Sequence, residues 1–282
     1  MPSTALDLLP PSAPWIMGVL NVTPDSFSDG GRYAAVDAAV VQARTMLAEG
    51  ACCLDIGGEA TSPGTAPLDA AEELARIEPI VARLAGEAVL SIDTYHASTA
   101  ARCLELGARI VNDVSALRAD PAMADVVREH AAVLVMMHAK DGPLPHASDR
   151  PRYYGDVVRE IGDFLQERVD HALARGIRPE RLVLDPGWGR FVSLDPAHSF
   201  ELLRRFDELA ERFHPIPLLV GTSRKGFLGV PMADRDPVSQ LTALAAIGRG
   251  ARFVRTHAPR MMCQFLDTAG KAGLTPVWPP AP

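Results

Sequence analysis

Short apolar runs alternate with longer segments of helical pattern along most of the chain. The runs are rich in Val, Ile and Leu and are not interleaved with polar residues, which is typical of parallel strands covered on both faces. Together they predict eight parallel strands, at residues 15–21, 52–57, 89–93, 109–113, 133–138, 181–185, 216–221 and 252–257.

The segments between the runs carry apolar residues at helical spacing, as in 34–51 and 69–85. Asp69 and Asp120 are expected near helix starts, and Pro121 suits a first helical turn. Glycines stand where helix C-caps are expected, at Gly50, Gly107 and Gly176. The alternation predicts an α/β fold, a (β/α)8 TIM barrel, in a single domain. An open doubly wound sheet is the alternative, but no G-x-G-x-x-G follows the first run.

Composition changes this picture little. No shift in composition divides the chain, so we expect a flexible N-terminal segment at 1–14, a barrel domain at 15–272 and a Pro-rich C-terminal tail at 273–282. The net charge of −7 argues against a broad nucleic-acid or anionic-membrane surface. No apolar run reaches the ~18 residues that a membrane span needs. Without signal-peptide features or metal-type cysteine spacing, we expect a cytoplasmic protein with reduced thiols.

Polar or ionisable residues stand at the end of every expected strand. A single such residue is readily explained as a helix N-cap, but capping does not explain the complete set. The carboxyl ends of barrel strands meet on one face, where active sites are built, so these residues predict a polar bowl on an apolar barrel. They are Asn21, Asp55, Asp93, Asn112, Asp113, His138, Asp185, Gly221, Thr222, Ser223, Arg255 and His257.

Acceptor groups gather at the middle strands and cations at the last two. Carboxylates suit the paired N–H donors of a guanidine-like ring edge, and an amide suits ring nitrogen and carbonyl groups. Late strand ends of barrels often hold phosphate. The pattern predicts a ligand with a hydrogen-bond-donating ring at one end and an anion at the other. The acceptors are Asp93, Asn112 and Asp185, and the cations are Lys225, Arg255 and His257.

Two loops near these residues are rich in hydroxyl and amide groups and in Gly and Pro. They read NVTPDSFSDGG (21–31) and DIGGEATSPG (55–64). They are either ordinary surface loops or lids that offer backbone N–H groups to anionic oxygens and close over a ligand. Asn21, with Asp25 or Asp29, is placed to reach a Mg²⁺ ion that accompanies a diphosphate.

With these motifs in place, the chain resembles the dihydropteroate synthases from Ile16 to His257. The motifs read IMGVLNVTPDSFSDGG, LDIGGEATSPG, SIDT, GARIVNDVSAL, VMMH, LDPGWG, GTSRKGFLG and VRTH. The resemblance implies a transferase of folate biosynthesis that condenses p-aminobenzoate with 6-hydroxymethyl-7,8-dihydropterin diphosphate by a dissociative displacement. It also implies Mg²⁺ as cofactor, a homodimer, and a pterin-binding barrel.

The resemblance also implies roles for individual residues. Catalytic roles fall on Asp93, Asp185, Lys225, Arg255 and His257. Pterin binding falls on Asp93, Asn112, Met137, Asp185, Gly221, Lys225 and Arg255. Diphosphate binding falls on Asn21, Thr61, Arg255 and His257, with Asn21 also a Mg²⁺ ligand. The p-aminobenzoate pocket is formed by Thr61, Ser62, Pro63, Arg190, Phe191 and Ser223.

Three positions depart from the usual family pattern. Ser62 stands where a loop Arg is usual, Arg190 and Phe191 stand where a Phe–Gly pair is common, and VRTHAP replaces VRVHDV. The lost Arg, the strand-eight change and the stretch FVSLDPAHSFELLRRF (191–206) are similar to the acquired sulfonamide-resistant members. We therefore expect a reshaped p-aminobenzoate wall that discriminates against sulfonamides.

Two other functions remain open at this point. The missing loop Arg favours a pterin-binding paralogue without synthase activity, and the barrel also suits a pterin-dependent methyltransferase domain. Against the methyltransferase stand the late-strand cations and the first loop, which a diphosphate site needs. Against the paralogue stands the presence together of Asp93, Asn112, Asp185, Lys225, Arg255 and His257. We interpret His138 as a structural residue in preference to a general base.

Overall fold

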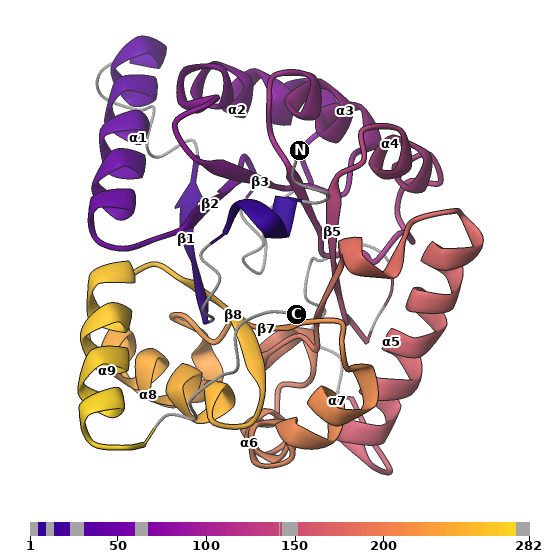
Figure 1. The fold of residues 1–282 in the computed structure, drawn as a ribbon, viewed down its shortest axis with the longest axis vertical. Coiled ribbons are helices and arrows are strands. Elements are labelled where there is room, and N and C mark those ends of the chain that lie inside the picture. The colour runs from indigo at the N-terminus through magenta and orange to yellow at the C-terminus, as the bar shows by residue number, and fades with distance from the viewer. Residues whose placement is uncertain are drawn as a thin grey trace.

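The parallel strands of this chain close into a barrel. The computed structural model describes residues 5–9, 14–22, 31–59, 67–140, 142 and 152–274. Within them, strands β1 to β8 pair with their neighbours in chain order, and β8 pairs with β1. The helices form a ring around this barrel (Figure 1). The predicted (β/α)8 TIM barrel and single domain are confirmed, and the open sheet is excluded.

The elements lie close to their predicted positions. The strands are β1 (Trp15–Asn21), β2 (Cys53–Gly57), β3 (Val89–Asp93), β4 (Ile110–Asp113), β5 (Val133–Met137), β6 (Leu182–Asp185), β7 (Leu218–Val220) and β8 (Ala251–Thr256). The α-helices are α1 (Gly31–Ala48), α2 (Ala70–Leu84), α3 (Ala97–Glu105), α4 (Met123–Glu129), α5 (Val157–Ala174), α6 (Pro196–Arg204), α7 (Phe206–Phe213), α8 (Arg235–Ile247) and α9 (Pro259–Lys271). Short 3-10 turns are η1 (Ala5–Leu8), η3 (Pro179–Arg181), η4 (Gly189–Phe191), η5 (Gly226–Leu228) and η6 (Met232–Asp234).

The helix starts agree with their predicted caps only in part. Asp69 caps α2, where its carboxylate accepts the N–H of Glu72 at 2.7 Å. Asp120 accepts the N–H of Ala97 at the start of α3, because the loop before α4 crosses beside that helix. Pro121 lies before α4, which begins at Met123, so its expected place in a first helical turn was wrong.

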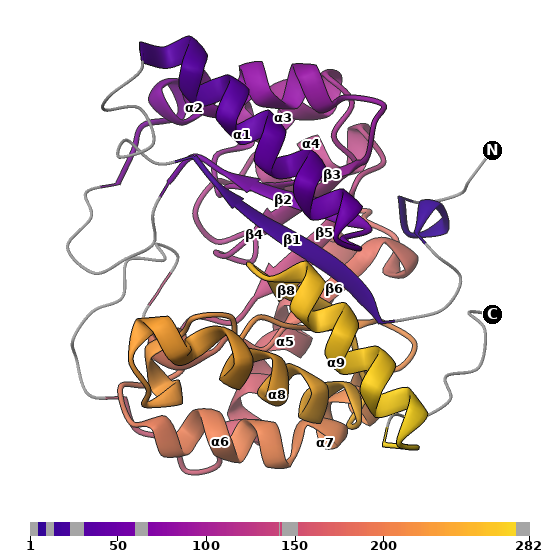
Figure 2. The same ribbon diagram turned by 90° about the vertical axis from the view of Figure 1, so that its left-hand side faces the viewer.

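Alternation along each strand divides the apolar side chains between two layers. Side chains that point outward pack against the surrounding helices, and those that point inward fill the barrel. The inward layer consists of Met17, Cys53, Ile110, Val133, Val135, Val183, Leu219 and Phe253, with Leu9 and Trp15. η1 lies at the N-terminal ends of the strands (Figure 2). The other end of the barrel, formed by the carboxyl ends of the strands, therefore remains open for a site.

Two further expectations concern the cysteines and membrane-spanning helices. All four cysteines are free thiols, as the spacing predicted. Among the helices of the described residues, none combines the length and the apolar character needed to cross a bilayer.

Candidate active site

Polar side chains replace apolar ones where the strands approach their carboxyl ends. Cys53 and Asp55 face the barrel interior on β2, and Phe253 and Arg255 do so on β8, because side chains two apart on a strand share a face. On β3, Ser91 pairs in register with Asp55. The inward positions thus carry a polar layer directly above the apolar one.

Asp55 is the centre of this layer, and its carboxylate is completely buried. Its Oδ1 accepts the hydroxyl of Ser91 at 2.7 Å. Its Oδ2 accepts from the Asn112 amide at 3.0 Å and from Nε of Arg255 at 2.6 Å. The sequence placed Asp55 at a strand end but assigned it no role. Its two-residue spacing from the inward Cys53 was the available signal.

Arg255 joins the two acidic residues of neighbouring strands. Its Nη2 donates to Oδ2 of Asp93 at 2.7 Å, while its Nε is held by Asp55. The guanidinium therefore lies among the acceptors of the mouth. Burial raises the pKa of Asp93 to about 7 although Arg255 opposes this shift. Burial also acts against the charge of Arg255, but the two carboxylates outweigh it and raise its pKa.

Asp185 ends β6 on the opposite side of the mouth. Its Oδ1 accepts the N–H of Gly187 at 2.8 Å, and burial raises its pKa to about 6. Gly187 has φ +74°, and a Cβ there would lie 2.3 Å from the carbonyl oxygen of His138. Only glycine fits this turn. Gly221 lies beside this carboxylate, where an added Cβ would be 3.7 Å from Oδ2 of Asp185, an ordinary van der Waals contact.

The two basic residues after β7 point in different directions. Arg224 adopts φ +57° and makes a two-pronged ion pair with Asp236 of α8, at 2.7 and 2.8 Å. Lys225 instead faces Asp185 and Asp93, and burial lowers its pKa to about 8. Its Nζ lies 4.6 Å from the centroid of the Phe191 ring. Only Lys225 of this pair belongs to the mouth.

His257 and Asn21 meet at the end of the barrel where β8 and β1 are neighbours. Nδ1 of His257 is hydrogen-bonded to the Ser223 hydroxyl at 2.9 Å, and Nε2 lies 3.5 Å from the Asn21 amide nitrogen. Burial, with help from Arg255, lowers the pKa of His257 to about 3. The ring is therefore neutral and binds through directed hydrogen bonds.

An apolar wall lines the side of the mouth formed by the middle strands. It consists of Tyr95, Val114, Met137 and Ala139, with Phe191 packed against it. Tyr95 also donates its hydroxyl to Glu59 of the second loop at 2.9 Å. Arg190 is exposed beside this wall. The mouth thus has an apolar face for a ring and polar groups around it.

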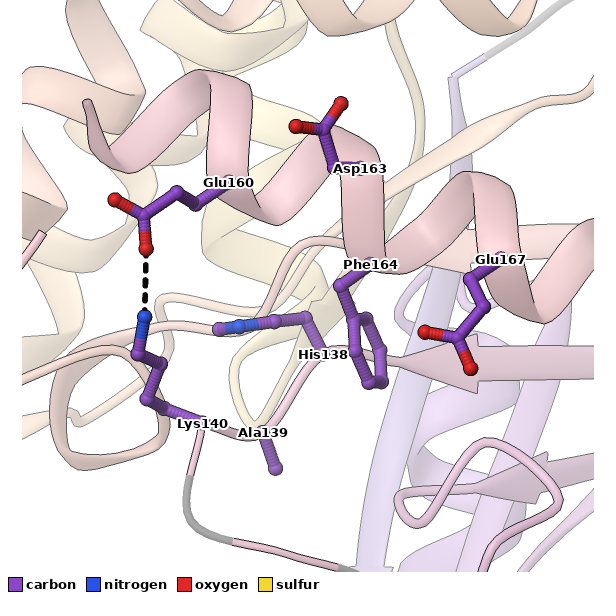
Figure 3. Close-up of a pocket in the computed structure, with 7 residues that line it drawn as sticks. All are labelled: His138, Ala139, Lys140, Glu160, Asp163, Phe164 and Glu167. Carbon is purple, nitrogen blue, oxygen red and sulfur yellow. Dashed lines mark hydrogen bonds and ion pairs between the residues drawn. The ribbon is translucent and has the colours of Figure 1, made fainter. Parts of the chain in front are cut away.

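His138 lies outside this site. It follows the inward Met137 and points away from the mouth toward α5, where its ring packs edge-on against Phe164 at 5.0 Å. The pocket between the end of β5 and α5, with Lys140 and Glu160 beside it, is shown in Figure 3. Burial lowers the pKa of His138 to about 3. Its position supports a structural role in preference to that of a general base.

Some predicted residues lie outside the described part of the chain. They are Thr61, Ser62 and Pro63 of the second loop, and Asp25 and Asp29 of the first. Within the described part, no group of three or more His, Cys, Asp and Glu side chains is arranged to hold a metal ion. Asn21 offers one amide oxygen. Such a sparse donor set fits Mg²⁺, which commonly keeps several waters and binds mainly through substrate phosphates.

Several known proteins are similar to this chain in sequence and in structure. The model of the family described as pterin binding enzyme matches residues 17–257. The dihydropteroate synthase of Mycobacterium leprae (strain TN) is 43% identical over 266 residues, which cover 90% of this chain and 92% of that protein. The dihydropteroate synthase type-2 of Escherichia coli is 40% identical over 251 residues, 87% of this chain and 91% of its own.

Solved structures give the same result. The Xanthomonas albilineans dihydropteroate synthase with 4-aminobenzoic acid has a TM-score of 0.84 at 36% identity, over 94% of this chain and 95% of its own. The same enzyme in complex with 7,8-dihydropteroate has a TM-score of 0.82 at 34% identity, over 95% and 97%. The chain therefore belongs to the pterin binding enzyme family and, within it, to the dihydropteroate synthases.

Proposed function

We propose that this protein condenses p-aminobenzoate with 6-hydroxymethyl-7,8-dihydropterin diphosphate, yielding 7,8-dihydropteroate and pyrophosphate in folate biosynthesis. The observation that carries the proposal is the pair of carboxylates at one barrel mouth, Asp185 buried and Asp93 partly buried, beside the cations Lys225 and Arg255. These groups suit a pterin edge and an anionic leaving group. The related complexes with 4-aminobenzoic acid and 7,8-dihydropteroate support these substrates.

The buried charges suit a dissociative displacement. The C–O bond to the diphosphate breaks first, its electron pair leaves on the diphosphate oxygen, and a cation remains on the exocyclic methylene, delocalised into the dihydropterin. Asp93 and Asp185 favour that cation, because carboxylates fixed in a partly buried site act strongly on developing positive charge. The neutral arylamine nitrogen then forms the C–N bond and releases a proton to solvent.

The leaving group is expected on the side of the mouth that carries His257. His257 and Asn21 lie on this side and can donate hydrogen bonds to diphosphate oxygens, and Arg255, which donates to Asp55 and Asp93, is proposed to join them when the pterin is bound. Asn21 and the substrate oxygens would hold Mg²⁺, which when bound supplies positive charge to the departing diphosphate. Thr61 is proposed to complete this subsite.

The p-aminobenzoate pocket is proposed beside the apolar wall. Phe191, Arg190 and Ser223 border this region, and Ser62 and Pro63 are proposed to close it. Because Ser62 and Arg190 depart from the usual pattern, we propose weaker inhibition by sulfonamides than in common members. Inhibition by sulfamethoxazole at the concentrations that stop sensitive members would rule this out.

The oligomeric state and the location in the cell belong to the same proposal. Met232 of η6 and Leu241 of α8 are 61% and 59% exposed, which supports a homodimer through the late elements. Light scattering of the purified protein tests the proposed homodimer, and a monomer at assay concentration would contradict it.

The four free thiols support a cytoplasmic location, because such thiols persist in reducing compartments.

Pyrophosphate release tests the reaction directly. The purified protein is incubated with the dihydropterin diphosphate and Mg²⁺, with and without p-aminobenzoate. Release that depends on p-aminobenzoate and yields dihydropteroate is the expected result. Binding of the pterin without any dihydropteroate would overturn the proposal in favour of the non-catalytic paralogue.

A further inference from the structure

The turn that carries Phe191 is held in place by the preceding βα loop. The backbone N–H of Lys140 donates to the carbonyl oxygen of Phe191 at 3.1 Å. The hydroxyl of Tyr154 donates to the carbonyl oxygen of the next residue, Val192, at 2.8 Å. Val192 is fully buried, so this carbonyl lies where water is a poor substitute for the tyrosine. Two consecutive carbonyls of the turn are thus fixed from outside it.

Both donors are themselves anchored to the start of α5. Glu160 accepts the Nζ of Lys140 on one carboxylate oxygen and the N–H of Gly155 on the other, each at 2.7 Å. Figure 3 shows Lys140 reaching Glu160 in this way. The Nζ of Lys140 also lies 4.1 Å from the centroid of the Tyr154 ring. Glu160 therefore fixes Lys140 and the chain beside Tyr154 together.

The other side of Phe191 faces the reaction site. Its ring packs on the apolar wall that includes Met137, and the Nζ of Lys225 lies 4.6 Å from its centroid. A shift of the turn by a fraction of an ångström would therefore move the ring against both groups. Position at this scale affects ligand affinity in a preformed pocket.

We propose that Tyr154 is a positioning residue for the p-aminobenzoate pocket: its hydrogen bond to Val192 sets the place of the Phe191 ring. This inference rests on the proposed function, since it assumes that the ring borders the arylamine. Tyr154 touches no substrate in this role. It acts on p-aminobenzoate through the turn, and leaves the carboxylates that hold the pterin unchanged.

The test is Tyr154→Phe, which removes one hydroxyl and keeps the ring beside Lys140. We expect KM for p-aminobenzoate to rise roughly fivefold, the size of effect that loss of one buried hydrogen bond produces. KM for the dihydropterin diphosphate is expected to stay unchanged. The matched control is Tyr153→Phe at the preceding residue, whose side chain is 82% exposed, and this variant should behave as the wild type.

A purely structural tyrosine gives a different result. In that case Tyr154→Phe lowers the melting temperature but leaves both KM values in their wild-type ratio, and the inference is wrong. Calorimetric titration of p-aminobenzoate, with 6-hydroxymethyl-7,8-dihydropterin and pyrophosphate present, makes the same comparison without turnover. A wild-type protein that binds p-aminobenzoate but forms no dihydropteroate contradicts the proposed reaction alone. If the wild-type protein does not bind p-aminobenzoate, both proposals fail.

Discussion

At Asp185, a single substitution can remove the negative charge of the carboxylate while it keeps the shape of the side chain. Among the described residues, it accepts a hydrogen bond from the backbone N–H of Gly187, whereas Asp55 and Asp93 each bind a guanidinium. Its pKa of about 6 leaves it mostly ionised at neutral pH. An asparagine at this position keeps an oxygen for Gly187 and loses only the charge and one acceptor.

Asp185→Asn is therefore expected to lower kcat/KM by roughly 10²- to 10³-fold, the range seen when one group that stabilises transition-state charge is removed. The far-ultraviolet circular dichroism spectrum should not change, because the turn at Gly187 is retained. Pyrophosphate release measures the effect. A variant with the kcat/KM of the wild type would refute the role given to this carboxylate.

The mouth also predicts a bell-shaped pH dependence. Log kcat/KM should rise with pH through about 6 to 7, as Asp185 and Asp93 lose their protons, and should fall above about 8 as Lys225 loses its own. The apparent values belong to the interacting set and not to single residues. Initial rates across the pH range measure the profile.

Lys225→Arg is the control for the alkaline limb. Arginine stays protonated throughout this range, so the fall above about pH 8 should disappear even if the rate is lower. An alkaline limb that persists unchanged in this variant would assign that limb to another group.

At the scale of elements, the turn after β6 is the most constrained part of the mouth. Gly187 combines a left-handed φ with a close approach to the carbonyl of His138. The same turn brings the N–H of Gly187 to Asp185, and the N–H of His138 donates to the Asp185 carbonyl at 2.9 Å. The turn therefore couples the end of β5, the end of β6 and the site.

Gly187→Ala should lower the free energy of unfolding by ~2 kcal/mol or more, from backbone strain together with a steric clash. It should also lower kcat/KM, since Asp185 loses its aligned N–H. Gly86→Ala is the control, because Gly86 has φ +82° but no atom within 4 Å of the added Cβ. Chemical denaturation compares the two variants. Equal destabilisation and retained activity in both would show that the clash at Gly187 is relieved without consequence.

The elements were largely predictable because apolar runs and helix caps are local signals. Eight of the sixteen predicted strand starts and ends agree with the structure, the other eight shift by only one or two residues, and Asp69 caps its helix as expected. Directions of single side chains were not predictable. Lys225 faces the mouth and Arg224 turns to α8 because Arg224 takes a positive φ, which its sequence does not signal. Asp55 was missed as a partner of Arg255 because that contact joins residues 200 positions apart.

At the scale of the whole molecule, the barrel supports a mouth whose ionised carboxylates oppose folding. The apolar layers and the ring of helices are separate from the site and supply the burial that stabilises the fold. A carboxyl whose pKa is raised in the folded protein is less favourable as an ion there than in the unfolded chain. The ionised carboxylate of Asp185 thus favours the proposed reaction but lowers the stability of the folded protein.

Asp185→Asn should accordingly be more stable than the wild type near neutral pH. The folded pKa is raised from 3.8 to about 6, so the wild type loses stability as pH rises through that window. The gain in melting temperature should vanish well below pH 3.8, where the wild-type carboxyl is protonated in both the folded and the unfolded state. Differential scanning calorimetry measures it, with exposed Asp207→Asn as the control. A gain that does not vary with pH would contradict this account.

Arg255 presents two N–H groups of its flat guanidinium to carboxylates, Nε to Asp55 and Nη2 to Asp93. The guanidine-like edge of a pterin offers the same array. In the proposed reaction, the pterin edge therefore replaces the Arg255 guanidinium as the hydrogen-bond donor to Asp93. The affinity for the pterin then reflects the difference in free energy between two similar contacts to Asp93, and this difference keeps the affinity moderate. The displaced guanidinium becomes available to the anionic end of the same molecule.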